Sequence, residues 1–127
     1  ERENRERAMS ILESVGLAAK AQDYAGALSG GQRKLLEIAR ALMARPKLIL
    51  LDEPAAGVNP TLIGQICEHI VKWNQEGISF LIIEHNMDVI MSLCHHVWVL
   101  AEGTNLADGT PEEIQNNPEV LEAYLGQ

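Results

Sequence analysis

The segment at positions 28–32, which reads Leu-Ser-Gly-Gly-Gln, has the residue types of a phosphate-binding turn. Glycines allow a backbone to approach a ligand closely, and the amphipathic stretch that follows is expected to be a helix. The start of such a helix offers unpaired N–H groups and the positive end of its dipole. The alternative is an ordinary loop before a helix. The residues of this candidate anion site are Ser29, Gly30, Gly31 and Gln32.

A second candidate segment follows closely, and it favours the anion site over the ordinary loop. It is an apolar run at positions 48–51 that ends in the acidic pair Asp52 and Glu53. A strand that ends in this way places two carboxylates at the carboxyl edge of a sheet, where α/β proteins bind ligands. We expect Asp52 to help hold Mg²⁺ through its water shell, and Glu53 to orient or deprotonate an attacking water. The alternative is a pair of solvated acids at a strand end.

His85 is the third candidate, because it follows another apolar run at positions 78–83. Parallel strands end at the same edge of a sheet, so we expect His85 to lie near Glu53 and to contact a terminal phosphate. A lone histidine after a strand is more often structural, and only the preceding motifs favour function here. No role is expected for the remaining histidines or for the cysteines, which lack metal-binding or redox spacing. These residues are His69, His95, His96, Cys67 and Cys94.

These candidates need a sheet with helices between its strands, and the hydrophobic pattern predicts one. Helices are expected over residues 3–15, 32–44, 61–75 and 87–93, and two short ones after Thr110 and Asn117. Strands are expected over residues 48–51, 78–83, 97–100 and 105–107. The uninterrupted apolar runs are typical of strands that are buried on both faces. The alternation predicts an α/β fold with a mainly parallel sheet flanked by helices.

The composition and net charge of the chain argue against some classes of protein. The chain has 127 residues, of which 46% are hydrophobic, and its formal net charge is −8. The acidic balance argues against nucleic acid as a partner, since phosphate backbones attract basic surfaces. No apolar run approaches the roughly 18 residues that a membrane span needs. The sequence begins without Met in a charged stretch, and we expect it to be a piece of a longer chain.

The order of the three candidate segments resembles the ATP-binding-cassette (ABC) ATPases. Positions 28–32 resemble the signature motif, positions 48–53 the Walker B motif with its catalytic Glu, and His85 the switch histidine. Within that family the chain looks most like ATP-binding subunits of importers for branched-chain amino acids, or for the related amides and urea. Three segments carry this finer resemblance, namely 55–60 (Ala-Ala-Gly-Val-Asn-Pro), 84–90 (Glu-His-Asn-Met-Asp-Val-Ile) and the tail at 117–126.

The resemblance implies that two ATPase subunits, alike or different, enclose ATP head to tail. The signature residues at positions 29–32 would close on ATP held by the second subunit, while Asp52, Glu53 and His85 would serve the nucleotide and Mg²⁺ on their own subunit. Asn59 would lie in the D-loop, where many relatives carry Asp. Transmembrane permease subunits would be the other partners, so the protein would lie at the cytoplasmic face of the membrane.

The resemblance also implies a division of the chain into three parts. Residues 1–45 would be the end of a helical subdomain with the signature motif. Residues 46–109 would form the core from the Walker B strand to the C-terminal strands, and residues 110–127 the C-terminal helices.

No Gly-x-x-x-x-Gly-Lys-Ser/Thr phosphate loop occurs in this sequence. We therefore expect a partial P-loop NTPase fold without the phosphate-loop strand, and no ATP hydrolysis by this piece alone. In the family that strand lies between the strands expected at 78–83 and 97–100. Its absence would leave the strand at 78–83 with an unpaired edge and separate the strand at 97–100 from it, and we expect re-pairing or self-association to close this gap. The alternatives are a non-transport ABC-type ATPase and a binding module that has lost catalysis. The acidic charge and the Ala-Ala-Gly-Val-Asn-Pro segment at 55–60 oppose the first, and retention of Asp52, Glu53 and His85 opposes the second.

Overall fold

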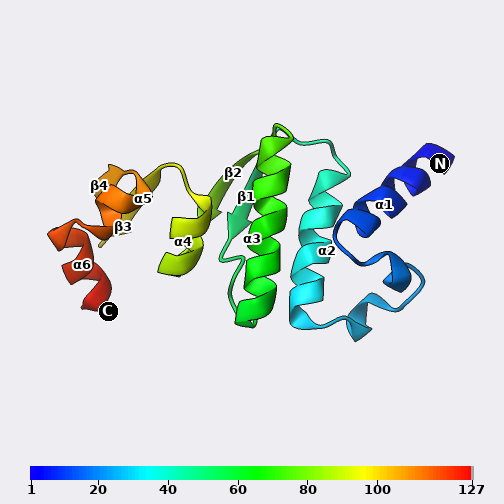
Figure 1. The fold of residues 1–127 in the computed structure, drawn as a ribbon, viewed down its shortest axis with the longest axis horizontal. Helices are drawn as coiled ribbons and strands as arrows, with labels where there is room; N and C mark the ends of the chain where they lie inside the picture. The colour runs from blue at the N-terminus through cyan, green and yellow to red at the C-terminus, as the bar shows by residue number, and fades with distance from the viewer. Residues whose placement is uncertain (127) are drawn as a thin grey trace. The chain divides into compact units, whose positions relative to one another are not determined.

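The computed structural model describes residues 1–126, which divide into two compact units, one ending at Glu84 and the other beginning at His85. Figure 1 labels the helices and strands. The first unit contains α1 (Arg2–Ser14), the short 3-10 helices η1 (Ala18–Lys20) and η2 (Ala25–Ala27), α2 (Gly30–Leu42), β1 (Leu48–Asp52), α3 (Pro60–Gln75) and β2 (Ser79–Ile83).

Strands β1 and β2 are parallel, and α3 is the crossover that joins them. The pairing runs without interruption from Leu48 opposite Ser79 to Asp52 opposite Ile83. Parallel strands need a long connection, which the helix provides. The predicted α/β arrangement of parallel strands with flanking helices is confirmed, and the carboxyl ends of both strands meet at one edge.

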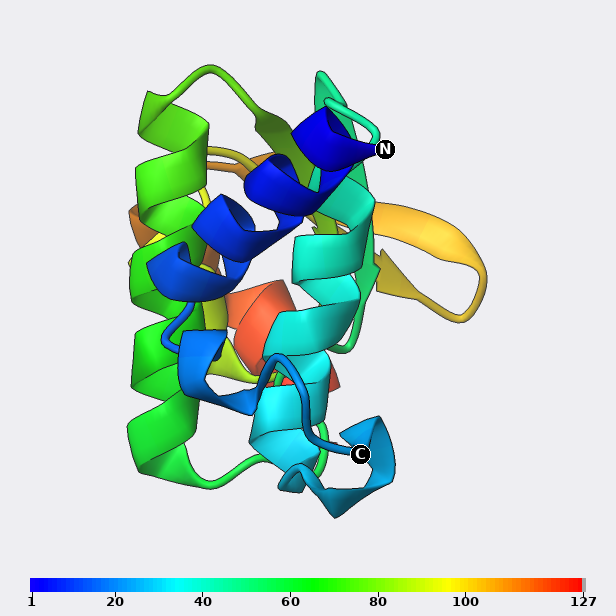
Figure 2. The ribbon, with the colours of Figure 1, turned by 90° about the vertical axis from the view of Figure 1, so that its right-hand side faces the viewer.

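The helices of the first unit form its core. In Figures 1 and 2, α2 and α3 run side by side with their N-terminal ends at the same end of the unit, and α1 packs against α2. A guanidinium N–H of Arg7 on α1 donates to the carbonyl oxygen of Leu42, 2.9 Å away, and so satisfies an acceptor at the last turn of α2. The buried side chains of this unit are Val15, Leu17, Leu28, Leu35, Ile38, Ala39, Leu42, Ile49, Ile66, Ile70 and Trp73.

Within the first unit, the described helices cover only one face of the β1–β2 sheet. Ile49 is buried, but its neighbour Leu50 is 67% exposed and Ile83 on β2 is 63% exposed. Leu48 and Leu81 lie on the same open face and are more than half exposed. The prediction that these apolar runs are buried on both faces was therefore wrong for this chain, because its helices pack on one face alone.

The second unit contains α4 (Met87–Leu93), β3 (Val97–Ala101), β4 (Thr104–Gly109), α5 (Pro111–Gln115) and α6 (Pro118–Leu125). Strands β3 and β4 form an antiparallel hairpin, with a register shift after Val99. The buried side chains Val89, Ile114 and Val120 come from α4, α5 and α6. Within residues 1–126, β2 pairs only with β1 and β3 only with β4, so the gap expected from the missing strand is not closed by re-pairing inside the chain.

Among the described residues, no helix combines the length and the apolarity that crossing a membrane requires.

Candidate functional site

The segment predicted as an anion-binding turn is the start of α2. Ser29 caps the helix, and its hydroxyl oxygen accepts a hydrogen bond from the backbone N–H of Gln32 at 3.2 Å. The side-chain oxygen of Gln32 accepts in return from the backbone N–H of Ser29 at 3.0 Å. The helix therefore begins at Gly30, two residues before the predicted start. The Ser-x-x-Gln spacing is the signal that sequence reasoning missed.

This capping box decides which groups of the segment can contact an anion. It uses the Ser29 and Gln32 side chains to satisfy two backbone donors at the helix start. The first-turn donors that it does not use are the backbone N–H groups of Gly30 and Gly31, and these have no partner within the helix. The positive end of the helix dipole reinforces both groups. The capping box uses Ser29 and Gln32 only as acceptors, so the Ser29 O–H and the Gln32 side-chain NH₂ can add side-chain donors to the predicted anion site.

The two glycines meet different surroundings. A Cβ on Gly31 would overlap Cδ2 of Leu62 on α3 and would lie 2.6 Å from its Cγ. A Cβ on Gly30 would meet only the carbonyl oxygen of Gly57, at 3.9 Å. Gly31 is thus required for the close packing of α2 on α3, a role that sequence reasoning did not assign. Gly30 has room around it and is exposed.

Asp52 is the last residue of β1, and Glu53 follows in a left-handed backbone conformation with φ of 48°. This region is uncommon for residues other than glycine. The N–H of Glu53 donates to the carbonyl oxygen of Ile83 at 2.8 Å, so the chain remains attached to β2 for one residue beyond β1. Both acidic residues are exposed, whereas Pro54 behind them is buried. The predicted placement of two carboxylates at the carboxyl edge of the sheet is what the structure has.

Asn59 caps α3. Its side-chain oxygen accepts from the N–H of Leu62 at 3.0 Å, and Pro60 occupies the first helical position. A proline there is favourable because its missing N–H would have no partner in the helix. The residue predicted to lie in the D-loop thus has a local role as a helix cap.

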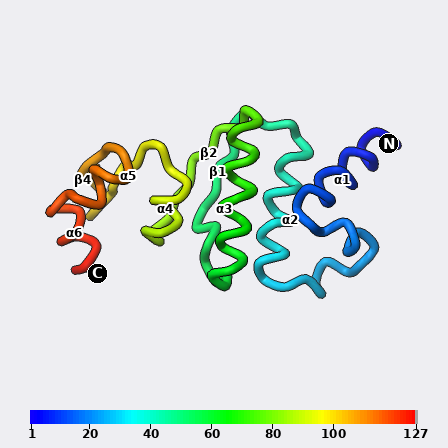
Figure 3. Tube along the Cα trace, viewed as in Figure 1, coloured from blue at the N-terminus to red at the C-terminus, as the bar shows by residue number. Residues whose placement is uncertain are grey.

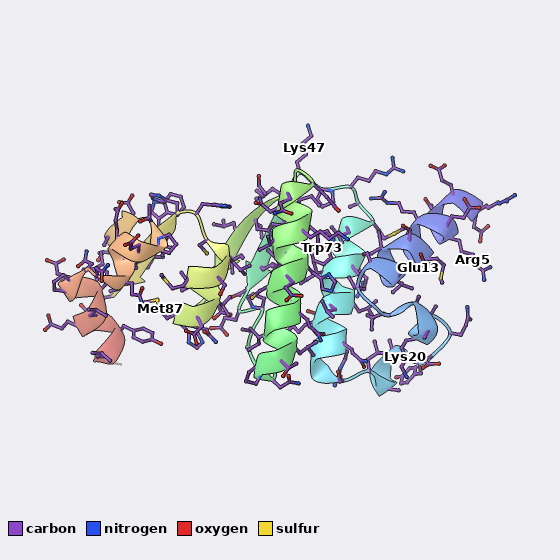
Figure 4. All side chains as sticks on the ribbon, in the orientation of Figure 1. Arg5, Glu13, Lys20, Lys47, Trp73 and Met87 are labelled. Carbon is purple, nitrogen blue, oxygen red and sulfur yellow. The ribbon has the colours of Figure 1, made fainter. Side chains whose placement is uncertain are left out.

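Several of the predicted residues lie at one end of the first unit. Figures 1 and 3 show that the N-terminal ends of α2 and α3 and the carboxyl end of β1 are at the same end. Lys47, which Figure 4 labels at the turn before β1, is at the opposite end. The elements therefore bring the following residues to the end of the unit where β1 has its carboxyl end: Ser29, Gly30, Gly31, Gln32, Asp52, Glu53 and Asn59.

His85 begins the second unit, directly before the residue that caps α4. That cap is Asn86, whose side-chain oxygen accepts from the N–H of Val89 at 3.3 Å. The proximity of His85 to Glu53 and its contact with a phosphate remain predictions. His69 is one of the histidines for which no role was expected, and it stacks on Trp73 with ring centroids 5.5 Å apart. Burial lowers the pKa of His69, and the positive charge of the nearby Lys72 lowers it further.

One further residue at this edge was missed by sequence reasoning. The carboxylate of Glu84, directly after β2, accepts a hydrogen bond from the backbone N–H of Ala55 at 3.1 Å. Glu84 is half-buried. The available signal was an acidic residue between an apolar strand and the candidate His85.

The described residues contain no group of three or more His, Cys, Asp or Glu side chains suited to holding a metal ion. A single carboxylate such as that of Asp52 nevertheless fits Mg²⁺, which usually keeps several waters and takes its other ligands from substrate phosphates. The donor set at this edge is therefore compatible with Mg²⁺ that arrives together with a nucleotide.

In comparisons with known proteins, both the N-terminal and the C-terminal part of the chain match family models. Residues 1–56 match the family described as "ABC transporter", and residues 105–127 match "Branched-chain amino acid ATP-binding cassette transporter". The chain is 47% identical over 121 residues to the probable branched-chain amino acid transport ATP-binding protein LivG of Archaeoglobus fulgidus, covering 95% of this chain and 47% of that protein. It is 47% identical over 128 residues to the high-affinity branched-chain amino acid transport ATP-binding protein BraF of Pseudomonas aeruginosa, covering 100% of this chain and 50% of that protein. The chain thus spans about half the length of the curated relatives it matches.

Solved structures give the same result for the fold. An ATP-binding cassette of an ABC transporter in its ADP conformation matches with a TM-score of 0.92 and 42% sequence identity, covering 100% of this chain and 52% of that one. A nucleotide-free ATP-binding cassette from an ABC transporter matches with a TM-score of 0.91 and 44% identity, at the same coverage.

Proposed function

Because this chain corresponds to the C-terminal portion of an ABC transporter ATP-binding subunit, we propose that the longer protein hydrolyses ATP to drive import of branched-chain amino acids. The family implies nucleotide binding, and the relatives named above are ATP-binding proteins of branched-chain amino acid transport. The observation that best supports catalysis is Glu53, exposed at the carboxyl edge of the sheet on the same side as the start of α2.

In this proposal the residues at the β1 edge serve the nucleotide bound to their own subunit. Glu53 orients the attacking water and accepts its proton. Asp52 would hold Mg²⁺ through water, and the bound ion would supply positive charge against the phosphates. His85 contacts the terminal phosphate. The proposal thus assigns positioning and charge stabilisation, which dominate phosphoryl transfer, to residues that follow β1 and β2.

The start of α2 serves a second nucleotide, held by another ATPase subunit. The backbone N–H groups of Gly30 and Gly31 lie in the first turn of α2, where a phosphate is favoured. Ser29 and Gln32 keep that turn in shape through their capping box. The partners are therefore a second ATPase subunit and the transmembrane permease subunits, and the protein lies peripherally at the cytoplasmic face of the membrane.

The 127 residues present here are not proposed to hydrolyse ATP by themselves. They contain no phosphate loop, and the loop's lysine contributes much of the charge stabilisation in phosphoryl transfer. Asp52, Glu53 and His85 are all retained, which opposes a binding module without catalysis. The relatives are named for transport, which opposes the non-transport alternative.

The test is the substitution Glu53→Gln in the full-length subunit. We expect ATP turnover to fall by at least about 100-fold, the usual contribution of a general base, while ATP binding persists. Glu37→Gln, an exposed change on α2 with the same loss of charge, is the control and is expected to leave turnover unchanged. Turnover by Glu53→Gln at the wild-type rate would contradict the proposal.

The transport assignment has a separate test. The full subunit is reconstituted with its permease subunits, and uptake of leucine, isoleucine and valine is compared with that of urea and a short amide. ATP-dependent uptake restricted to urea or the amide would contradict the branched-chain amino acid assignment and leave the ATPase assignment intact.

A further inference from the structure

We propose that Glu84 is a positioning residue that holds the loop carrying Glu53 against the end of β2. This inference rests on the proposed function, because it concerns the geometry of the residue that we assign as general base. It concerns a side chain to which neither the motifs nor the comparisons assign a role.

Two consecutive residues at the end of β2 hold the loop after β1 at two points. The carbonyl oxygen of Ile83 accepts the N–H of Glu53 at 2.8 Å, and the carboxylate of Glu84 accepts the N–H of Ala55 at 3.1 Å. One contact is therefore made by Glu53 itself. The other contact is made by Ala55, which lies two residues further along the chain. Between these points the loop has little freedom to rotate.

The loop needs such a restraint because of its backbone conformation. Glu53 has φ of 48°, which L-residues other than Asn and Asp seldom adopt. A turn hydrogen bond from the N–H of Ala56 to the carbonyl oxygen of Glu53, at 3.1 Å, closes on the same residue. The backbone bond to Ile83 holds the loop at Glu53 but does not reach the residues that follow it. The second attachment, through Glu84, restrains those residues and fixes the direction in which the Glu53 side chain leaves the edge.

A carboxylate is well suited to this task. A hydrogen bond from a backbone N–H to an ionised acceptor is shorter and stronger than one to a neutral acceptor. Glu84 is half-buried, so water competes less for its oxygen than at an exposed site. The neutral amide of Gln keeps an acceptor of the same reach and shape. Glu84→Gln therefore separates the hydrogen bond from the charge, whereas Glu84→Ala removes both.

The first experiment measures the loop directly in the full subunit. Residue-resolved amide exchange of Ala55 is followed by NMR in the wild type, Glu84→Gln and Glu84→Ala. We expect exchange about tenfold faster in Glu84→Ala, as one lost charged hydrogen bond implies, and much closer to the wild-type rate in Glu84→Gln. The amide of the buried Ile49 is the internal control for folding.

The second experiment measures ATP turnover by the same three proteins. A misplaced general base slows the chemical step more than it weakens ATP binding, so we expect kcat to fall about tenfold in Glu84→Ala with little change in KM. Glu84→Gln is expected to recover most of this loss, and Glu37→Ala to resemble the wild type.

Three results would overturn the inference. The first is unchanged Ala55 exchange in Glu84→Ala, and the second is unchanged kcat despite faster exchange. The third is a kcat for Glu84→Gln as low as that for Glu84→Ala, because the charge would then act on the chemistry itself. A wild-type subunit without ATP turnover would refute the proposed function instead, and the exchange result would still report whether Glu84 holds the loop.

Discussion

The two glycines of the signature segment show how neighbouring residues of one type serve different purposes. Gly31 faces Leu62 with no room for a Cβ, whereas Gly30 is exposed and its nearest such neighbour is the Gly57 carbonyl oxygen. Only Gly31 is required by packing within the subunit. Packing within the subunit does not require glycine at position 30, which is compatible with the proposed approach of a phosphate to this position.

We predict that Gly31→Ala destabilises the protein by about 1–3 kcal/mol, the usual cost of overfilling a packed contact. Leu62 must move or α2 must shift away from α3 to accommodate the methyl group. Gly30→Ala is the matched control, and it is expected to be neutral or slightly stabilising because alanine favours the helix. Urea unfolding followed by circular dichroism measures both. Equal stability of the two variants would show that the Leu62 contact is not restrictive.

At the level of elements, the residue that caps the crossover helix α3 has two roles, one in the helix and one in the proposed site. Asn59 caps α3 through the N–H of Leu62, and the same residue lies in the segment that resembles the D-loop. Asp is as good a cap as Asn, and its charge suits the positive end of a helix. Asp at position 59 would therefore leave the helix start intact and change only the charge presented there.

We predict that Asn59→Ala lowers the free energy of unfolding by about 1 kcal/mol, whereas Asn59→Asp leaves it unchanged or slightly raised. Thermal and urea unfolding of the three proteins test this. If Asn59→Asp were as destabilising as Asn59→Ala, the contribution of this cap would be refuted. If Asn59→Asp also altered ATP turnover without altering stability, the charge would act across the subunit contact.

Sequence reasoning predicted elements well where one local signal was decisive. The Thr110 and Asn117 caps each precede a proline at the first helical position, and both helices begin there. The start of α2 was placed two residues late, because the glycines suggested a loop and the Ser29–Gln32 capping box was overlooked. The candidate residues were found, but the contacts that hold them depend on packing between elements distant in the sequence. The Glu84 bond to Ala55 and the Leu62 contact with Gly31 are of that kind.

At the level of the whole molecule, the open face of the β1–β2 sheet is the main departure from expectation. Its apolar side chains are exposed in this chain, and the chain spans about half the length of its relatives. An exposed apolar sheet face favours association with another apolar surface. Within the described residues β2 pairs only with β1, so its other edge is also not paired, and self-association of this piece remains a prediction.

We predict that the isolated chain self-associates at micromolar concentration and binds a hydrophobic dye. Leu50→Lys and Leu81→Lys, on the open face, are expected to shift the chain toward monomer and to reduce dye fluorescence. Val71→Lys on α3 is the control, since its side chain is also exposed and apolar but lies on a helix. Sedimentation velocity of the four proteins provides the measurement. A monomeric wild-type chain with an intact β1–β2 pairing would contradict the prediction.

The contact of Leu62 with Gly31 has a consequence for how the two proposed nucleotide sites influence each other. Under the proposed function, α2 belongs to one nucleotide site, and the β1 edge with Glu53 belongs to another. α3 touches α2 through this contact and is joined by the chain to both β1 and β2. Because no space between α2 and α3 could absorb a movement at this contact, a displacement of α2 when its ATP binds or leaves would also displace α3. Under the proposed function, the close packing of Gly31 on Leu62 would therefore couple the two nucleotide sites mechanically.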